Sequence, residues 1–206
     1  MNAALAVDPD LPRRRLDVHE YHRMGEAGIL TEDDRVELID GEIIEMAPIG
    51  DPHVDLVIVL TERLTAAIGP RAAVSVQNPV RLDDRTEPQP DLAVLRLDRR
   101  RGVPLAADAL LVIEVAESSL AYDRDTKLPR FALSGIPEAW LVDAGRAALV
   151  RHRHPDGDGY RDRDEPDLAR AVALHGLPGV EVDLTGLFAT DLPGARPRDD
   201  GAKTPT

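Results

Sequence analysis

One short stretch of the sequence, residues 109–116, strongly restricts how the chain can fold. Seven of its eight residues are apolar, and the eighth is Glu114. An apolar run this short and dense is typical of a β-strand that is buried on both faces. A carboxylate inside such a strand costs free energy unless it meets a cation, a proton or a hydrogen-bond donor. Glu114 therefore belongs either to a functional site or to a buried ion pair that orders the core.

The elements on either side of this strand offer possible partners for Glu114. Residues 90–97 form a second apolar stretch that begins with an acid, Asp91, and residues 122–133 have helical spacing and carry Lys127. Two acids on neighbouring strands and a lysine on the next element indicate a site for a divalent cation and a phosphate. The alternative is that Lys127 pairs with Asp123, four residues earlier, in a surface ion pair worth ~0.3–0.5 kcal/mol.

The composition excludes several classes of protein. A chain of 206 residues with 43% hydrophobic residues suits one globular domain with a substantial core. The sequence has no cysteine, which excludes disulfides and thiolate metal sites and makes a reducing cytoplasm the expected location. No segment reaches the ~18 apolar residues of a membrane span, and the first residues lack the pattern of a signal peptide.

The charge of the chain bears on its partners. A net charge of −13 argues against non-specific coating of nucleic acid, because neutralising phosphates requires clustered Lys and Arg. It does not exclude a nuclease, whose acids can be concentrated at a metal site. A run of arginines at Arg96 and Arg99–Arg101 is either a phosphate-contacting loop or, more typically, a solvated loop.

Residues 35–46 carry the clearest local signal in the chain. An Asp40–Gly41 pair lies between two apolar-rich runs, which is typical of a β-hairpin with a type I′ turn. Glu37 lies three residues before the turn, and strand alternation places it on the same face as Ile39. Glu37 is therefore a further candidate for the site; the alternative is a charge on an exposed edge strand.

Histidines supply weaker candidates. Apolar residues between 52 and 68 recur at intervals of three and four, which predicts an amphipathic helix with His53 in its first turn. His53 could face a ligand, cap the helix or lie on the surface. His19 and His22 lack an evident third metal ligand and are more typical of a solvated helix face. His152 and His154 precede a hairpin tip and have no carboxylate strand beside them, so a metal site is not expected there.

These patterns together predict an α/β (α+β) fold, a mixed twisted sheet with the second and third helices packed on it. The predicted helices are 18–27, 52–68 and 122–133, and the predicted strands are 73–77, 79–82, 90–97, 109–116, 137–143, 147–152, 170–175 and 180–184. The two ends of the chain are rich in Pro, Asp and Arg without periodicity, which predicts disordered tails at 1–14 and 189–206 around a domain at 15–188.

Four motifs in this order resemble one known family. The chain is similar to the Uma-two family of restriction-endonuclease-like proteins, in the PD-(D/E)XK nuclease superfamily, over about residues 15–188. The likeness rests on ELIDGE (37–42), PDLAV (90–94), EVAESSLAYDRDTK (114–127) and GIPEAWLVD (135–143). The resemblance implies a restriction-endonuclease-like fold.

The resemblance also implies a set of site residues. Asp91 and Glu114 match the metal-binding acids, and Glu37 matches the acid that completes the site from the first strand. The wider superfamily has a lysine two residues after the second acid, where this chain has Ala116; the family pattern places a lysine on the following helix, which Lys127 matches. We expect the acids to bind one Mg²⁺ or Mn²⁺.

Oxygen ligands suit these cations, and the expected set also includes the backbone carbonyl of Val115 and several waters. The function implied is metal-dependent endonucleolytic cleavage of nucleic acid, DNA in the first place, by a protein that could be a homodimer. One alternative is a weak or inactive member of the fold that binds DNA or a partner protein; another is a hydrolase of a smaller phosphate. The complete set of Glu37, Asp91, Glu114 and Lys127 favours an enzyme, whereas the acidic balance favours the alternatives.

Overall fold

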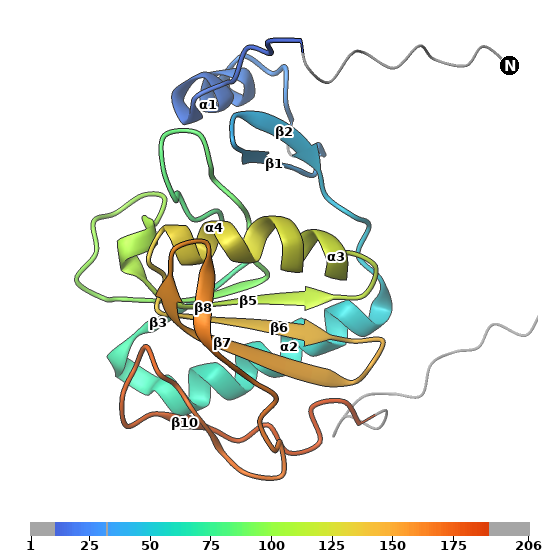
Figure 1. Cartoon of the computed structure of the whole chain (residues 1–206), viewed down its shortest axis with the longest axis vertical. Helices are drawn as coiled ribbons and strands as arrows, with labels where there is room; N and C mark the ends of the chain where they lie inside the picture. The colour runs from blue at the N-terminus through green and yellow to red at the C-terminus, as the bar shows by residue number, and fades with distance from the viewer. Residues whose placement is uncertain (1–10, 32, 190–206) are drawn as a thin grey trace, which may run out of the picture.

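The structure is a computed structural model that describes residues 11–31 and 33–189 (Figure 1). The predicted tails at 1–14 and 189–206 fall largely outside these ranges, so the predicted domain boundaries stay predictions. Within the described ranges no helix has both the length and the apolar character needed to cross a membrane.

The described chain contains both helices and strands, which do not alternate strictly. In chain order the elements are α1 (Val18–Glu26), β1 (Val36–Ile39), β2 (Glu42–Glu45), α2 (Asp51–Ile68), η1 (Gly69–Arg71), β3 (Ala73–Val76), β4 (Leu92–Leu95), η2 (Ala106–Asp108), β5 (Ala109–Ala116), α3 (Leu120–Tyr122), the π-helical turn η3 (Asp123–Lys127), α4 (Leu128–Leu133), β6 (Glu138–Asp143), β7 (Ala148–Asp156), β8 (Gly159–Asp164), β9 (Val172–Ala173) and β10 (Glu181–Val182).

The central sheet has six strands in the order β3-β4-β5-β6-β7-β8. All neighbouring strands in it are antiparallel except β5 and β6, which are parallel. A parallel pair needs a crossover connection, and residues 120–133 supply it as one continuous helix made of α3, η3 and α4 (Figure 1). The predicted mixed sheet flanked by helices is confirmed.

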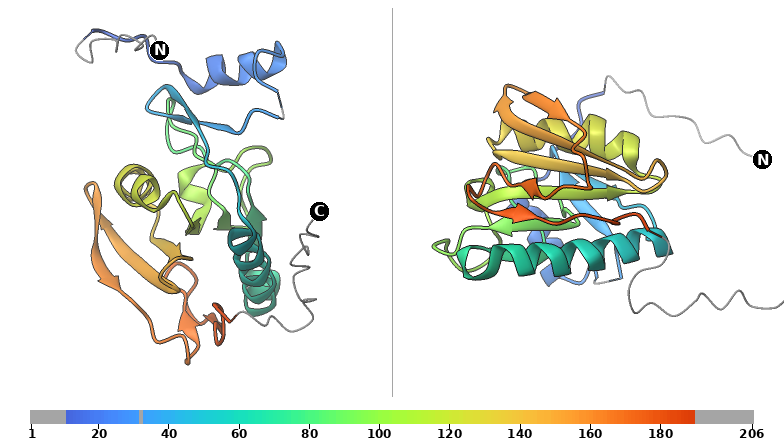
Figure 2. Two further views of the ribbon diagram at one scale, coloured as in Figure 1. Left: turned by 90° about the vertical axis from the view of Figure 1, so that its right-hand side faces the viewer. Right: turned by 90° about the horizontal axis from the view of Figure 1, so that it is seen from below.

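The two faces of the sheet are covered by different helices. Figure 2 shows α2 on one face and the α3–α4 helix on the other. Ile113 and Val115 of β5 pack in the cluster that contains α2, whereas Val112 packs with Phe131 of α4. Because strand side chains alternate between faces, Glu114 shares the face of Val112 and points to the α3–α4 helix.

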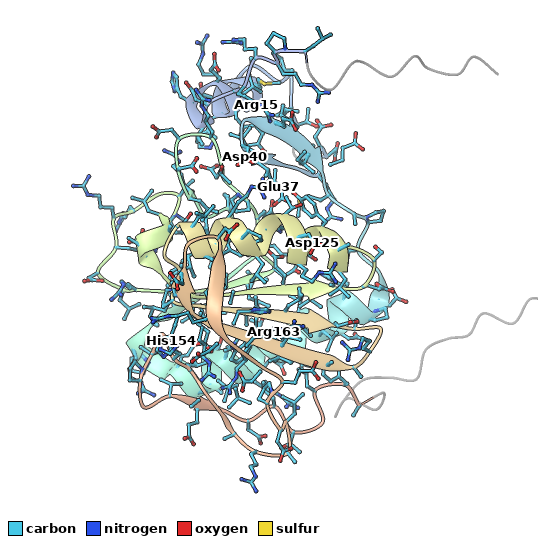
Figure 3. The ribbon with its side chains drawn as sticks, viewed as in Figure 1. Arg15, Glu37, Asp40, Asp125, His154 and Arg163 are labelled. Atoms are coloured by element: carbon cyan, nitrogen blue, oxygen red, sulfur yellow. The ribbon has the colours of Figure 1, made fainter. Side chains whose placement is uncertain are left out.

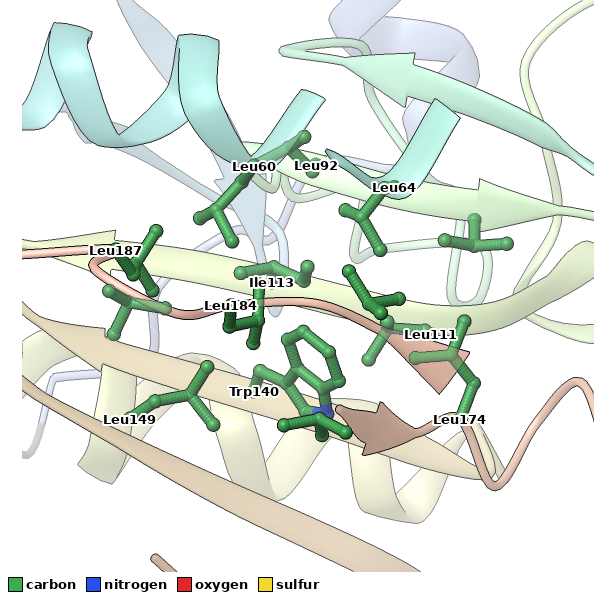
Figure 4. Packing of buried hydrophobic residues seen from close by; sticks show 14 of the residues in the cluster. Leu60, Leu64, Leu92, Leu111, Ile113, Trp140, Leu149, Leu174, Leu184 and Leu187 are labelled. Carbon is green, nitrogen blue, oxygen red and sulfur yellow. The ribbon is translucent and has the colours of Figure 1, made fainter. Parts of the chain in front are cut away.

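The larger core lies between α2 and the sheet. Leu60 and Leu64 of α2 are fully buried over Ile113 of β5 and Trp140 of β6 (Figure 4). Trp140 is a core residue, as its strand predicted, and its Nε1–H donates to Glu138 Oε1 at 2.8 Å. Truncating a core leucine such as Leu64 to alanine costs about 2–5 kcal/mol, so this layer anchors the strands that carry the site.

The β1–β2 hairpin stands apart from the central sheet, above the α3–α4 helix (Figure 1). Its turn has the predicted type I′ geometry, with φ of 50° at Asp40 and 78° at Gly41. A Cβ at Gly41 would lie 2.7 Å from the Cβ of Arg15, so this close approach requires glycine. An ion pair between Arg130 of α4 and Asp40 ties the hairpin to the helix.

The sequence prediction is wrong in detail at several elements. Residues 79–82 are not a strand, because Val80 N–H and Leu82 N–H donate to the nearby Pro88 and Thr86 carbonyls and only Arg81 forms an isolated bridge, with Leu105. The crossover helix begins at Leu120 rather than at residue 122. The last two strands are only two residues long each, since loops rather than ladders occupy the rest of those segments.

Candidate active site

The pairing of β4 with β5 brings the two predicted metal-binding acids together. Leu92 stands opposite Ile113 in this antiparallel ladder. Asp91 and Glu114 are the next residues on each side, so they meet at the same end of adjacent strands. A hydrogen bond links the two strand ends, because the backbone N–H of Val115, the residue after Glu114, donates to Asp91 Oδ2 at 2.8 Å.

Lys127 reaches this pair from the crossover helix. Its Nζ lies 2.8 Å from Glu114 Oε1 and 3.4 Å from Glu37 Oε2, and the side chain is only 3% exposed. Nζ also donates to the Gln89 carbonyl at 3.4 Å. The backbone between Asp123 and Lys127 is a π-helical turn, a local widening of the helix that occurs frequently at functional sites.

Glu37 enters the site from the hairpin, and Figure 3 shows it between the hairpin and the α3–α4 helix. It is buried. The hydroxyl of Tyr122 donates to Glu37 Oε1 at 2.9 Å, and the backbone N–H of Gln89 donates to Oε2 at 2.9 Å. With Lys127 beside Oε2 as well, both oxygens of Glu37 have protein partners. Glu37 therefore holds Lys127 in place from the side of the hairpin.

His53 is also part of the cluster, a role that the sequence left open. It lies in the first turn of α2, is buried, and its Nε2 is 2.9 Å from Asp91 Oδ1. Its Nδ1 is buried without a hydrogen-bond partner among the described residues. Asp91 thus has a partner on each oxygen, His53 on one and the Val115 amide on the other.

Asp123 is a site residue that sequence reasoning missed. The helical spacing to Lys127 indicated an exposed pair, but both side chains are buried and Asp123 accepts a hydrogen bond from Ser119 Oγ at 2.5 Å. Burial raises the pKa of Asp123, which the nearby Lys127 charge opposes. The spacing itself was the signal, because residues four apart share a helix face and the face that buries the lysine also buries the acid.

The electrostatics of the cluster follow from burying several acids around one lysine. Burial raises the pKa of Glu114 well above its ordinary value, and Lys127 opposes that rise. The carboxylates of Asp123, Asp91 and Glu37 raise it further. Burial alone would lower the pKa of Lys127, but the surrounding carboxylates, Glu114 first, outweigh it and raise that pKa. The lysine therefore remains an ammonium in a site that carries an excess of negative charge.

These residues line one cleft of about 460 Å³. Its described lining includes six carboxylates but only two permanently charged cations, Arg35 and Lys127. The acids are Glu37, Glu45, Asp91, Glu114, Glu117 and Asp123. A volume of this size falls within the range of small-molecule sites.

The donor set fits a hard divalent cation. No group of three or more His, Cys, Asp or Glu side chains is placed to hold a metal ion by itself within the described ranges. Mg²⁺ does not require such a group, because it is usually bound through one or two carboxylates, with water and phosphate oxygens as the other ligands. Asp91 and Glu114 supply two carboxylates at one point, and the uncompensated acidity of the cleft favours a cation there.

The other polar runs of the sequence lie outside this cleft. Arg96 follows β4 at the end where Leu95 pairs with Ala109, which is the end of β5 far from Glu114. Arg99 in the same loop donates to backbone carbonyls of its own turn. The remaining histidines that the sequence singled out also lie elsewhere: His22 pairs with Glu87, His154 pairs with Asp162, and His152 packs against Tyr160.

The fold and the arrangement of these side chains define a class of protein. A mixed sheet with acids at the meeting ends of two adjacent strands, and a lysine on the helix that follows, is a restriction-endonuclease-like α+β fold. Residues 18–185 match the model of the Uma2 family, described as "Putative restriction endonuclease", and the chain belongs to this family. The predicted family membership is confirmed.

A solved structure supports the same fold. The chain is similar to a protein from Anabaena variabilis ATCC 29413 described as "a putative nuclease belonging to DUF820", with a TM-score of 0.65 and 16% sequence identity. The match covers 84% of this chain and 97% of that one. A search of curated proteins finds no match to the chain.

Proposed function

We propose that the protein is a divalent-metal-dependent endonuclease that hydrolyses phosphodiester bonds of DNA. Membership of a restriction-endonuclease family supports a nuclease. The observation that carries the proposal is the convergence of Asp91, Glu114 and a charged Lys127 in one cleft, with Lys127 Nζ 2.8 Å from Glu114 Oε1. Fold alone does not establish activity, so the proposal rests on this geometry.

Asp91 and Glu114 are the residues that would hold the cation, Mg²⁺ or Mn²⁺, together with the Val115 carbonyl. When bound, such a cation lowers the pKa of a water molecule and neutralises charge on the phosphate. His53 and the Val115 amide fix the Asp91 carboxylate in one orientation. Because the Asp91 carboxylate is already fixed, less conformational entropy is lost when a cation binds.

Lys127 supplies the second positive charge of the site. Next to Glu114 it is placed to orient the attacking water and to stabilise the negative charge that develops on the phosphoryl oxygens. Glu37 and Gln89 hold its ammonium from the other side. Ala116 occupies the position where the wider superfamily carries its lysine, and in this chain the crossover helix supplies the charge instead.

A plasmid-nicking assay tests this function. Purified protein with Mg²⁺ or Mn²⁺ is expected to convert supercoiled DNA to open-circular and linear forms, and EDTA is expected to stop the conversion. Glu114→Gln is expected to be inactive, whereas Glu181→Gln, an exposed acid on β10, is the matched control and is expected to cleave normally. Equal cleavage by Glu114→Gln and wild type would remove this cleft from the reaction.

A second function is favoured by one observation, the acidity of the cleft. In a catalytically inactive member of the fold, the buried network of Lys127, Glu37 and Glu114 would be a structural ion cluster, and the protein would act by binding DNA or another protein. DNA binding without metal-dependent cleavage in the nicking assay favours this alternative.

A further inference from the structure

Two chemically different sets of residues line the cleft. One set is the acids with Lys127, and the other is the segment Met46-Ala47-Pro48-Ile49, which follows Glu45 at the end of strand β2. Ile49 is 39% exposed, and Ala47 and Pro48 are exposed as well. None of the four belongs to either core cluster of the described chain. Three consecutive apolar residues beside an acidic site, preceded by the partly buried Met46, thus remain open to solvent.

Arg35, the residue directly before strand β1, holds this apolar segment in place. The backbone N–H of Met46 donates to the Arg35 carbonyl at 2.8 Å, and Arg35 Nη1 donates to the Ala47 carbonyl at 2.9 Å. The segment therefore has a fixed course along the cleft although it has no strand partner there.

Arg35 is itself exposed and lines the cleft. Within the described ranges it forms no ion pair with a carboxylate, whereas Lys127 is paired with Glu37 and Glu114. Arg35 is therefore the permanent cation of the cleft that can receive a phosphate, and the planar guanidinium suits phosphate oxygens. An apolar surface beside a single free arginine matches the two halves of a nucleotide, base and phosphate.

The charge balance decides between a duplex and a single strand. A protein that grips a duplex neutralises several phosphates with Lys and Arg, but this cleft offers one free arginine in a chain of net charge −13. A single strand exposes unstacked bases, which contribute to binding through contact with side chains as well as through phosphate charges. Ile, Met and Pro are also the side chains that pack against unstacked bases in bent DNA.

We propose that Arg35 and the segment Met46–Ile49 bind one unpaired nucleotide of a DNA strand beside the bond that is cut. Arg35 holds its phosphate, and the apolar segment packs against its base. The inference rests on the proposed nuclease function, since it assigns the substrate of the same cleft. It makes unpaired DNA, such as a single strand or an open end, the preferred substrate over an intact duplex.

Equilibrium binding tests the inference without requiring cleavage. Fluorescence anisotropy is measured on a labelled DNA strand, and on the same strand annealed to its complement, with Ca²⁺ in place of Mg²⁺; a gel afterwards shows whether the DNA is intact. The single strand is expected to bind about tenfold more tightly than the duplex. Equal or tighter binding of the duplex overturns the inference.

Two pairs of variants locate the binding surface. Arg35→Gln is expected to weaken strand binding and to reduce the slope of log affinity against log salt by about 0.7, and Arg100→Gln, in the exposed loop at the far end of the sheet, is its control. Met46→Ser with Ile49→Ser is expected to weaken strand binding about tenfold, with Leu97→Ser, 59% exposed, as its control. Unchanged binding in both cleft variants contradicts the proposal, as does an equal loss in Arg100→Gln.

Measuring binding and plasmid nicking on the same preparation distinguishes a failure of this inference from a failure of the proposed function. A preparation that cleaves DNA but binds duplex as tightly as single strand keeps the nuclease proposal and overturns the strand preference. A preparation that binds single strands through Arg35 but never cleaves keeps the binding surface and overturns the nuclease proposal.

Discussion

The ammonium of Lys127 lies 2.8 Å from the carboxylate of Glu114, and both side chains are buried at the end of the central sheet. The two residues are separated by a turn and the start of the crossover helix. Their contact makes an acid in a fully buried strand tolerable, because an unpaired charge in that position would cost several kcal/mol. The same contact positions a cation where a phosphate oxygen could be bound.

Metal binding is expected to depend on Asp91. In Asp91→Asn the cleft loses a charged oxygen ligand, so affinity for Mn²⁺ measured by calorimetry should fall at least about tenfold. The amide can still accept the hydrogen bond from the Val115 N–H, and the fold should persist. Asp125→Asn, at an exposed acid of the same helix region that pairs with Arg124, is the control. Equal Mn²⁺ affinity in Asp91→Asn and wild type would show that the metal assignment is wrong.

Gly41 is expected to be required for the stability of the hairpin that carries Glu37. Its φ of 78° and the 2.7 Å that would separate a Cβ from the Leu16 carbonyl oxygen both oppose any side chain. Gly41→Ala should therefore lower the free energy of unfolding by more than ~1 kcal/mol. Gly157→Ala has a similar positive φ of 61° but open space around it, so it carries only the backbone strain. Denaturant unfolding of the two variants measures the difference, and equal losses would contradict the close approach at Gly41.

Because His152 is buried, we expect part of the free energy of unfolding to be lost in acid. Burial, and secondly the charge of Arg163, lower its pKa to about 4. The unfolded chain takes up the proton near its ordinary pKa of about 6.5, so this contribution to stability is complete above that pH and is lost as the pH falls from about 6.5 to about 4. Thermal unfolding across this range should show a shallower pH dependence in His152→Gln than in wild type. His19→Gln, at an exposed histidine of α1, should keep the wild-type slope; an unchanged slope in His152→Gln would remove the residue from the pH response.

The protein is expected to be a homodimer. Short strands and the exposed β3 and β8 edges of the central sheet offer surfaces for pairing with a second copy. Light scattering at micromolar concentration should give about twice the chain mass of 22.5 kDa. A mass equal to that of one chain would reject the prediction.

The sequence predicted the elements that follow strong local rules. The strand at 109–116 that is buried on both faces, the Asp40–Gly41 turn and the helix at 52–68 each follow from neighbours in the chain, and all are present. The four candidate site residues were predicted from buried acids, a helical lysine and a family resemblance, and the structure places them in one cleft.

His53 and Asp123 could not be assigned because their environments depend on long-range packing. His53 meets Asp91 only when α2 docks at the end of β4, 38 residues away in the chain. Asp123 is buried only because its helix crosses the sheet beneath the hairpin. The wrongly predicted strand at 79–82 has another origin, since Val80 and Leu82 donate to the turn at 86–88 and only Arg81 forms a single bridge instead of a ladder.

The central claim is that the buried lysine acts in DNA cleavage, and single-turnover nicking of plasmid DNA by wild type, Lys127→Ala and Lys127→Arg tests it most directly. Circular dichroism first establishes that each variant is folded. We predict that Lys127→Ala lowers the cleavage rate about a hundredfold or more without weakening Mg²⁺ binding, because a transition-state charge is lost while both acids remain. Lys127→Arg should restore little, since a planar fork does not replace a point charge. Cleavage by folded Lys127→Ala at the wild-type rate would contradict the account.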